Sequence, residues 1–291
     1  MIRIATRDSA LAKAQAGQVA ALLGEAELVE VSSDGEPGDK ARFVRGVERA
    51  LLEGEADIGV HSAKDVPAEM PEGLLIAAVP KREDPSDVWI GVGDSLDDVP
   101  EGARVGTASL RRRAQLLAAR PDLQVSELHG NVDTRLRKLA EDDLDAIVLA
   151  AAGLRRLGRA DEASFALPAK AMTPAAGQGA LVLQAREDDA GAIEAAGAIG
   201  DETALLELTA ERAVVALLDA TCATPIGVHA MVEGEALAIE AFVGLPDGGE
   251  WIRDRVEGEA EEPAAAGARL AERLLSAGAR DILDRAEKER V

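Results

Sequence analysis

Residues 61–67 read HSAKDVP, and the rest of the chain is best interpreted outward from this stretch. It follows ADIGV at residues 56–60, a short apolar run that predicts a buried strand. In open α/β sheets, ligands bind beyond the carboxyl ends of the strands. Asp65 would lie there beside Lys64, remain ionised and face a cationic species. The alternative is a surface Lys-Asp pair, which is common and contributes little to stability. The neighbouring segments decide between these two interpretations.

The bulk composition describes a chain that can build a large core. With 291 residues it is long enough for two or three domains, and 47% of it is hydrophobic. Only 2% is aromatic, so Ala, Val, Leu and Ile must fill the core. No apolar run is long enough to span a bilayer, and the chain starts directly with strand-like MIRIA rather than a signal peptide. A single cysteine, Cys222, excludes an intramolecular disulfide and fits a reducing cytoplasm, where we expect the protein. We also expect a monomer.

The formal net charge of −22 argues against a nucleic-acid partner, which would require a basic surface. The acidic clusters at residues 25–30, 97–98, 141–143, 187–189 and 257–262 read as solvated surface. We therefore favour a halophilic protein, because molar salt shortens the Debye length to about 3 Å and screens self-repulsion. An ordinary acidic protein is the alternative.

Two strand–helix units are predicted on either side of a hinge. Residues 2–6 form a strand, Ser9 caps a helix that runs to residue 23, and a second strand covers residues 26–31. The polar segment 32–39 is predicted to be a mobile loop that delivers Lys40 and Phe43 into a helix. The charged segment 81–87 is the hinge, after which strands are predicted at residues 87–92 and 104–108.

Arginines recur where strands end or helices begin. SLRRRAQL at residues 109–116 has a capping Ser109 followed by arginines in the first turn, where the helix dipole prefers carboxylates. That conflict favours an anion completing the site; a solvated basic turn, or pairing with the surplus carboxylates, is the alternative. The five positions are Arg7, Arg111, Arg112, Arg135 and Arg156. If these ends face one cleft, its ligand carries several carboxylates or phosphates.

The last third of the chain predicts a second crossing and a small α+β domain. PAAGQGAL at residues 174–181 lets backbones pack closely and lacks the Lys-Ser/Thr of a phosphate loop. A helix at 203–219 precedes ATCATPIG at 220–227, then strand-like residues 228–256 and a helix at 263–285. Cys222 on that loop is either a buried small side chain, as most lone cysteines are, or a nucleophile or attachment point.

Taken together, these motifs resemble the porphobilinogen deaminase (hydroxymethylbilane synthase) family over nearly the whole chain. They are HSAKDVP, GTASLRR at 106–112, GNV at 130–132, GQGA at 177–180, and Cys222 ahead of PIG at 225–227. The resemblance implies an α/β fold with two type II periplasmic-binding-protein-like domains around a cleft, plus a small α+β C-terminal domain. The expected ranges are 1–80 with 180–199 returning to it, 86–174, and 202–291.

The resemblance also implies the chemistry. A dipyrromethane cofactor would be bound by thioether to Cys222, and four porphobilinogens would condense on it stepwise, each losing ammonia, before hydrolysis releases hydroxymethylbilane. Asp65 takes the position of the catalytic carboxylate that stabilises the cationic azafulvene, and Lys64 orients it. No metal ion is expected. The residues expected to hold cofactor and substrate are Arg7, Ser9, Lys64, Thr107, Ser109, Arg111, Arg112, Arg135, Arg156 and Gln178.

The chain departs from the family pattern at three places. His129 stands where the family has arginine, so that anion contact becomes pH-dependent. Ala220-Thr221 replaces Gly-Gly before Cys222, and the loop that carries Lys40 is short. Two other functions stay open: a non-catalytic, two-lobed anion-binding or ligand-sensing protein, and a decayed paralogue.

Overall fold

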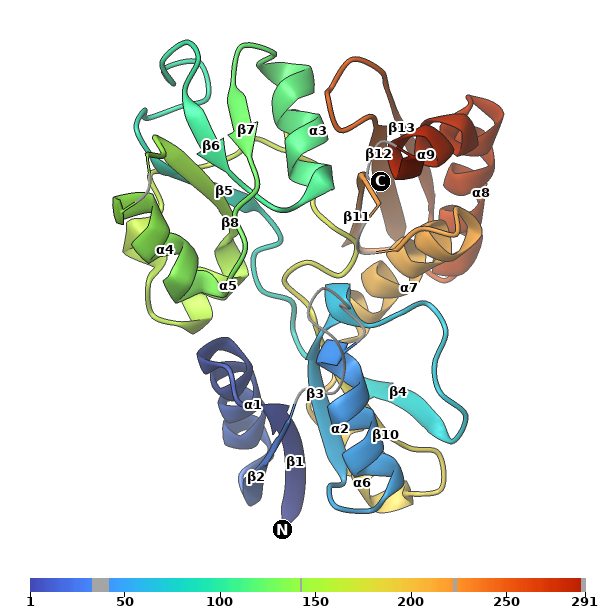
Figure 1. Cartoon of the computed structure of the whole chain (residues 1–291). Helices are drawn as coiled ribbons and strands as arrows, with labels where there is room; N and C mark the ends of the chain where they lie inside the picture. The colour runs from blue at the N-terminus through green and yellow to red at the C-terminus, as the bar shows by residue number, and fades with distance from the viewer. Residues whose placement is uncertain (33–41, 142, 222–223, 289–291) are drawn as a thin grey trace.

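A computed structural model of the chain describes residues 1–32, 42–141, 143–221 and 224–288 (Figure 1). The predictions for Lys40, for Cys222 and for most of the loop 32–39 lie outside these residues. Within them, no helix is long and apolar enough to cross a membrane.

The first sheet has five strands in the order β2-β1-β3-β10-β4, and only β10 runs antiparallel to its neighbours. Its core contains Ile4, Ile58 and Leu183, which are fully buried. The strands are β1 (Ile2–Arg7), β2 (Ala26–Val31), β3 (Ile58–Ser62), β4 (Leu74–Ala78) and β10 (Leu181–Arg186). The helices packed on it are α1 (Ala10–Leu23), α2 (Arg42–Leu52) and α6 (Ala190–Gly197), and the short η1 (Ala63–Asp65) follows β3.

The second sheet repeats this plan with the order β7-β6-β8-β5-β9. Here β5 is the antiparallel strand between its neighbours. The strands are β5 (Asp87–Gly91), β6 (Arg104–Gly106), β7 (Gln124–Ser126), β8 (Ala146–Ala150) and β9 (Phe165–Ala166). Its helices are α3 (Leu110–Ala119), α4 (Val132–Glu141), α5 (Ala151–Arg156) and the short η2 (Ala160–Glu162). In each sheet the antiparallel strand directly follows a crossing between the two sheets, which is the expected type II arrangement (Figure 1).

The third unit is a three-stranded antiparallel sheet covered by helices. It consists of α7 (Glu202–Leu217), β11 (Ile226–Glu233), β12 (Ala236–Gly244), β13 (Trp251–Glu259), α8 (Pro263–Ser276) and α9 (Ala279–Lys288). The prediction of one helix over 263–285 was wrong, because Gly278 adopts a φ of 100° and the chain turns between α8 and α9. The predicted α/β fold with a small α+β C-terminal unit is confirmed.

The two crossings between the sheets touch at glycines. Glu83 N donates to Gly179 O at 3.2 Å. A Cβ on Gly179 would lie 2.2 Å from Glu83 O, and one on Gly177 would lie 2.8 Å from Ala63 Cβ. Both glycines also have positive φ. The close backbone packing predicted for PAAGQGAL is therefore confirmed, and it brings Gln178 beside the end of β3.

Candidate active site

Asp65 lies just beyond the carboxyl end of β3, at the end of η1. It lines a small cavity together with Arg7 from the end of β1 and Gln15 from α1. Gln15 is 5% exposed, and its Nε2 donates to Ser62 Oγ at 2.8 Å. The structure thus brings the predicted carboxylate and one predicted arginine to the same cavity.

His61 supports this end of β3 from inside the sheet. Its Nε2 lies 3.0 Å from Gln184 Oε1, and Gln184 Nε2 donates to Glu48 Oε1 at 3.1 Å. Burial lowers the pKa of His61 to about 4. The imidazole is therefore neutral at pH 7, and it donates from Nε2 to the glutamine.

Lys64 faces the second crossing. Its Nζ donates to Gln178 Oε1 at 3.5 Å. Burial, reinforced by the nearby positive charge of Arg112, lowers the pKa of Lys64 to about 8. The side chain is half-buried, so at neutral pH it is a partly desolvated cation that gains strongly from an anionic neighbour.

Asp87 is the central anion of the second sheet, and the sequence analysis did not single it out. It is fully buried at the start of β5. Arg111 Nη1 donates to its Oδ2 at 2.7 Å, and Arg112 Nε donates to its Oδ1 at 2.9 Å. Gln178 Nε2 donates to Oδ1 at 3.1 Å. Burial alone would raise the pKa of Asp87, but the two guanidinium groups outweigh it and hold the pKa well below its usual range.

The first-turn arginines therefore have a counter-charge within the protein. Arg111 and Arg112 are each 5% exposed, and both pair with Asp87. In the first turn of α3, the structure therefore has the predicted alternative in which the arginines pair with a protein carboxylate. Two guanidinium groups share one carboxylate, so the cluster keeps a net positive charge, and Lys64 adds to it. The role of both arginines as ligands of the cofactor stays a prediction.

Three predicted hydroxyl ligands have the same local arrangement. Ser9 Oγ accepts from Ala12 N at the start of α1, and Ser109 Oγ accepts from Arg112 N at the start of α3. Thr107 Oγ1 accepts from Ser109 N at 3.2 Å. Because each hydroxyl accepts from a backbone N–H, its own proton remains available for a bound carboxylate. The two predicted helix caps are confirmed.

Arg135 and Arg156 carry the unused hydrogen-bond donors that an anionic cofactor requires. In the part of the chain that the structure describes, the Nε of each is buried without a partner. Burial, with a contribution from Arg112, lowers the pKa of Arg135 to about 10. Arg156 Nη2 donates to Gly179 O at 2.7 Å, and burial lowers its pKa as well. Buried, unpaired guanidinium N–H groups fit the carboxylates of a dipyrromethane.

A buried glutamate joins the crossings to the C-terminal unit. Glu211 of α7 is fully buried and accepts from Arg82 Nη1 at 2.8 Å and from Gly177 N at 2.6 Å. It also accepts from Ala230 N of β11 at 2.9 Å. The sequence analysis did not predict this contact. It also did not predict that Asp87 and Gln15 lie at the site. A lone charge opening the apolar run 88–90 was the one signal for Asp87.

Cys222, the predicted attachment point, lies outside the described residues. The flanking Thr221 N donates to Thr224 Oγ1 at 2.8 Å. His129 is exposed, and its Nε2 lies 2.9 Å from Glu127 Oε2.

Comparison with known proteins adds the family. The porphobilinogen deaminase "dipyromethane cofactor binding domain" matches residues 2–194, and the porphobilinogen deaminase C-terminal domain matches residues 205–276. The chain belongs to the porphobilinogen deaminase family. The porphobilinogen deaminase of Syntrophus aciditrophicus is 43% identical over 302 residues, which cover 98% of this chain and 99% of that protein. The one from Pelotomaculum thermopropionicum is 48% identical over 253 residues, covering 87% and 81% of the two chains.

Solved structures give a weaker likeness. A TRAP periplasmic solute binding protein from Desulfovibrio salexigens is 12% identical with a TM-score of 0.40, covering 70% of this chain and 73% of that one. The fold assignment rests on the strand order of the two five-stranded sheets. The family matches confirm the predicted family, its class of enzyme and the dipyrromethane cofactor. The individual site roles and the domain boundaries stay predictions.

Proposed function

We propose that the chain condenses four porphobilinogens stepwise on a Cys222-linked dipyrromethane, with loss of ammonia at each step and final hydrolysis to hydroxymethylbilane. The observation that carries this proposal is the cavity beyond β3, where Asp65 and Arg7 meet, beside a buried cluster with a surplus of positive charge. One acidic group among several cations suits a substrate that carries carboxylates and becomes positively charged as it reacts.

Asp65 is the residue we assign to the chemical step. Its carboxylate accepts hydrogen bonds from pyrrole N–H groups and stabilises the positive charge that develops as ammonia leaves the substrate. It also offers a site for proton transfer. When bound, the dipyrromethane supplies a tethered pyrrole carbon as nucleophile. The neutral His61 beneath this cavity holds the end of β3 and takes no proton at pH 7, because its pKa is about 4.

The cationic residues bind and orient carboxylates. Arg135 and Arg156 offer unpaired N–H donors, and the hydroxyls of Ser9 and Ser109 add donors at two helix starts. Lys64 gains a partner for its partly desolvated charge, which orients the ligand next to Asp65. Fixing several carboxylates at once holds the reacting pyrroles in register, which is where much of the rate enhancement of such a site arises.

The composition of the chain bears on where the enzyme works and what it binds. The single cysteine supports a cytoplasmic location for this porphobilinogen-binding enzyme. The net charge of −22 supports salt adaptation and the absence of a nucleic-acid partner. We propose that it acts as a monomer.

The intact mass of the purified protein tests the function. The wild-type mass should exceed the sequence mass by two condensed pyrroles, and Cys222→Ser should show no excess. Asp65→Asn should keep the cofactor and lower ammonia release at least about 100-fold, whereas the exposed control Asp94→Asn should match wild type. An unmodified Cys222, with carboxylate binding but no ammonia release, would establish the two-lobed binding protein instead. An unmodified chain with neither would indicate a decayed paralogue.

A further inference from the structure

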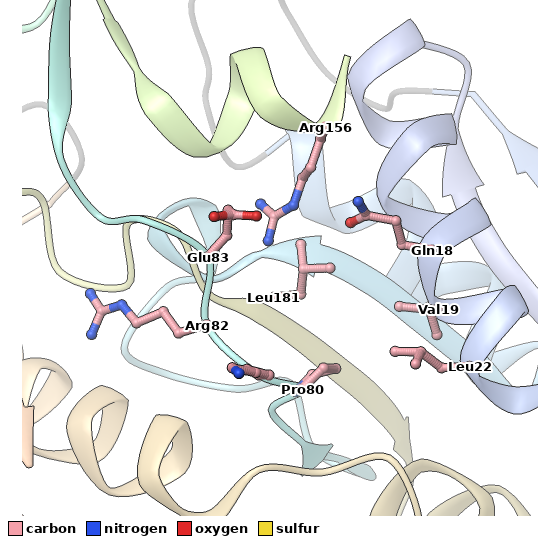
Figure 2. Close-up of a pocket in the computed structure, with 9 residues that line it drawn as sticks. Gln18, Val19, Leu22, Pro80, Arg82, Glu83, Arg156 and Leu181 are labelled. Carbon is pink, nitrogen blue, oxygen red and sulfur yellow. The ribbon is translucent and has the colours of Figure 1, made fainter. Parts of the chain in front are cut away.

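A second cavity, larger than the one at Asp65, lies between α1, the crossing at residues 80–83 and α5 (Figure 2). Its volume is about 250 Å³. Gln18 and Leu22 of α1, Lys81, Arg156 and Leu181 line it. Neither the family matches nor the role assigned to Arg156 above gives this space a function.

The walls combine an apolar floor with cationic edges. Leu181 is 4% exposed, and Leu22 is 60% exposed beside it. Figure 2 shows the guanidinium of Arg156 above Leu181, between Glu83 and the side-chain amide of Gln18. The Nε of Arg156 is buried without a partner among the described residues.

The one acidic residue among the described lining residues of this cavity, Glu83, shares the guanidinium of Arg155 with Asp84. Glu83 Oε1 accepts from Arg155 Nη1 at 2.9 Å and from Asp84 N at 2.9 Å. Lys81 is exposed, and the described part of the chain gives its amine no partner. The cavity therefore offers two cationic donors, the amine of Lys81 and the Nε of Arg156, above an apolar surface, which matches a pyrrole ring with carboxylate side chains.

The two cavities are neighbours along the same elements. Gln15 lines the cavity of Asp65, whereas Gln18 lines the second one. Residues three apart on a helix share a face about one turn apart. In the sheet, Leu181 of the second cavity pairs with Ser62 of the first. The second cavity therefore lies about one helical turn along α1 from the cavity of Asp65.

We propose that the second cavity receives a carboxylate-bearing pyrrole ring of the lengthened chain, with Lys81, Gln18 and Arg156 as its anion contacts. The proposal rests on the proposed function. It implies that the residues special to this cavity matter for late additions and not for the first one, because a short chain does not reach it.

Intact mass under limiting substrate tests this proposal. Lys81→Glu and Gln18→Leu should take up the first porphobilinogen at the wild-type rate. Protein carrying two or three added units should then accumulate several-fold above wild type. The matched control is Lys288→Glu, a reversal of an exposed lysine on α9, which should keep the wild-type distribution. A wild-type distribution in both cavity variants, or slowing of the first addition, overturns the proposal. If wild type itself adds no unit, the proposed function has failed instead.

A second measurement distinguishes whether the second cavity binds a pyrrole ring of the growing chain or only a free anion. Inorganic phosphate is titrated calorimetrically into wild type and Lys81→Glu, both carrying the cofactor but no substrate. Weak binding that Lys81→Glu abolishes, together with the late accumulation, supports the proposal. Loss of phosphate binding with an unchanged distribution of added units shows a free-anion site and overturns it.

Discussion

Lys64 is the residue whose ionisation the site controls most directly. Its pKa of about 8 results from burial and from the charge of Arg112, and the negative charge of an anion bound beside it opposes both effects. Loading the site with carboxylates should therefore raise the pKa of Lys64.

Amine labelling measures this shift. In Cys222→Ser, which lacks the cofactor, roughly half of Lys64 is neutral at pH 8, against well under 1% of an ordinary lysine. Trace acetylation should then follow a midpoint near pH 8, and loading the wild-type site should slow the labelling of Lys64 at pH 8 by about tenfold or more. The exposed Lys170 serves as internal reference. Equal Lys64 rates in loaded and unloaded protein would contradict this account.

His61 makes folding sensitive to acid. Its pKa is about 4 in the folded protein and about 6.5 when unfolded, so its contribution to stability is complete above pH 6.5. It is lost as the pH falls from 6.5 towards 4, because the unfolded state takes up the proton first. The loss amounts to about 3 kcal/mol.

Urea unfolding at pH 7, 5.5 and 4 tests this contribution. His61→Gln should lose about 3 kcal/mol less than wild type between pH 7 and 4. The control His129→Gln, at an exposed position, should follow the wild-type curve. A His61→Gln curve parallel to that of wild type would refute the assignment.

At the scale of elements, Asp87 fixes α3 to β5. Asp87→Asn leaves two buried guanidinium groups without their carboxylate, so the free energy of unfolding should fall by about 3–5 kcal/mol. The control Glu141→Gln removes the exposed Arg137–Glu141 pair and should change it by less than about 1 kcal/mol. Denaturant unfolding of both variants measures this. An equal fall in the free energy of unfolding for both would show that Asp87 does not fix α3 to β5.

The two crossings between the sheets touch where Gly179 packs against the backbone of Glu83. Gly179→Ala places a methyl group 2.2 Å from Glu83 O at a φ of 88°, so it should destabilise the protein by more than about 1 kcal/mol. Gly197→Ala in α6 meets nothing within 4 Å and should leave stability unchanged or slightly higher. Thermal unfolding compares the two, and a neutral Gly179→Ala would mean that the crossings separate easily.

At the scale of the molecule, positive charge lies inside, at the site, and negative charge lies on the surface. The arginines of the site are buried or half-buried, whereas the acidic clusters such as residues 257–262 are largely exposed. Screening this negative surface should stabilise the compact state. Between 0.1 and 2 M KCl, we expect the melting temperature to rise by roughly 5 °C and activity to persist. A melting temperature that is independent of salt would argue for an ordinary acidic protein.

The sequence by itself determined the features that depend on near neighbours in the chain. Ser9 and Ser109 cap helices because their partners lie three residues away, and the strand before Asp65 follows from five consecutive residues. The ordered motifs gave the family for the same reason, since each is a short contiguous string. The break at Gly278 was missed because apolar periodicity continues across it.

Only the tertiary structure decided which distant groups meet. Asp87 pairs with arginines 24 and 25 residues away, and Glu211 accepts from Arg82 129 residues away. The second cavity likewise takes its walls from α1, the crossing at residues 80–83, α5 and the start of β10. No local pattern encodes such contacts, because they form only when packing removes each charge from water and leaves one partner within reach.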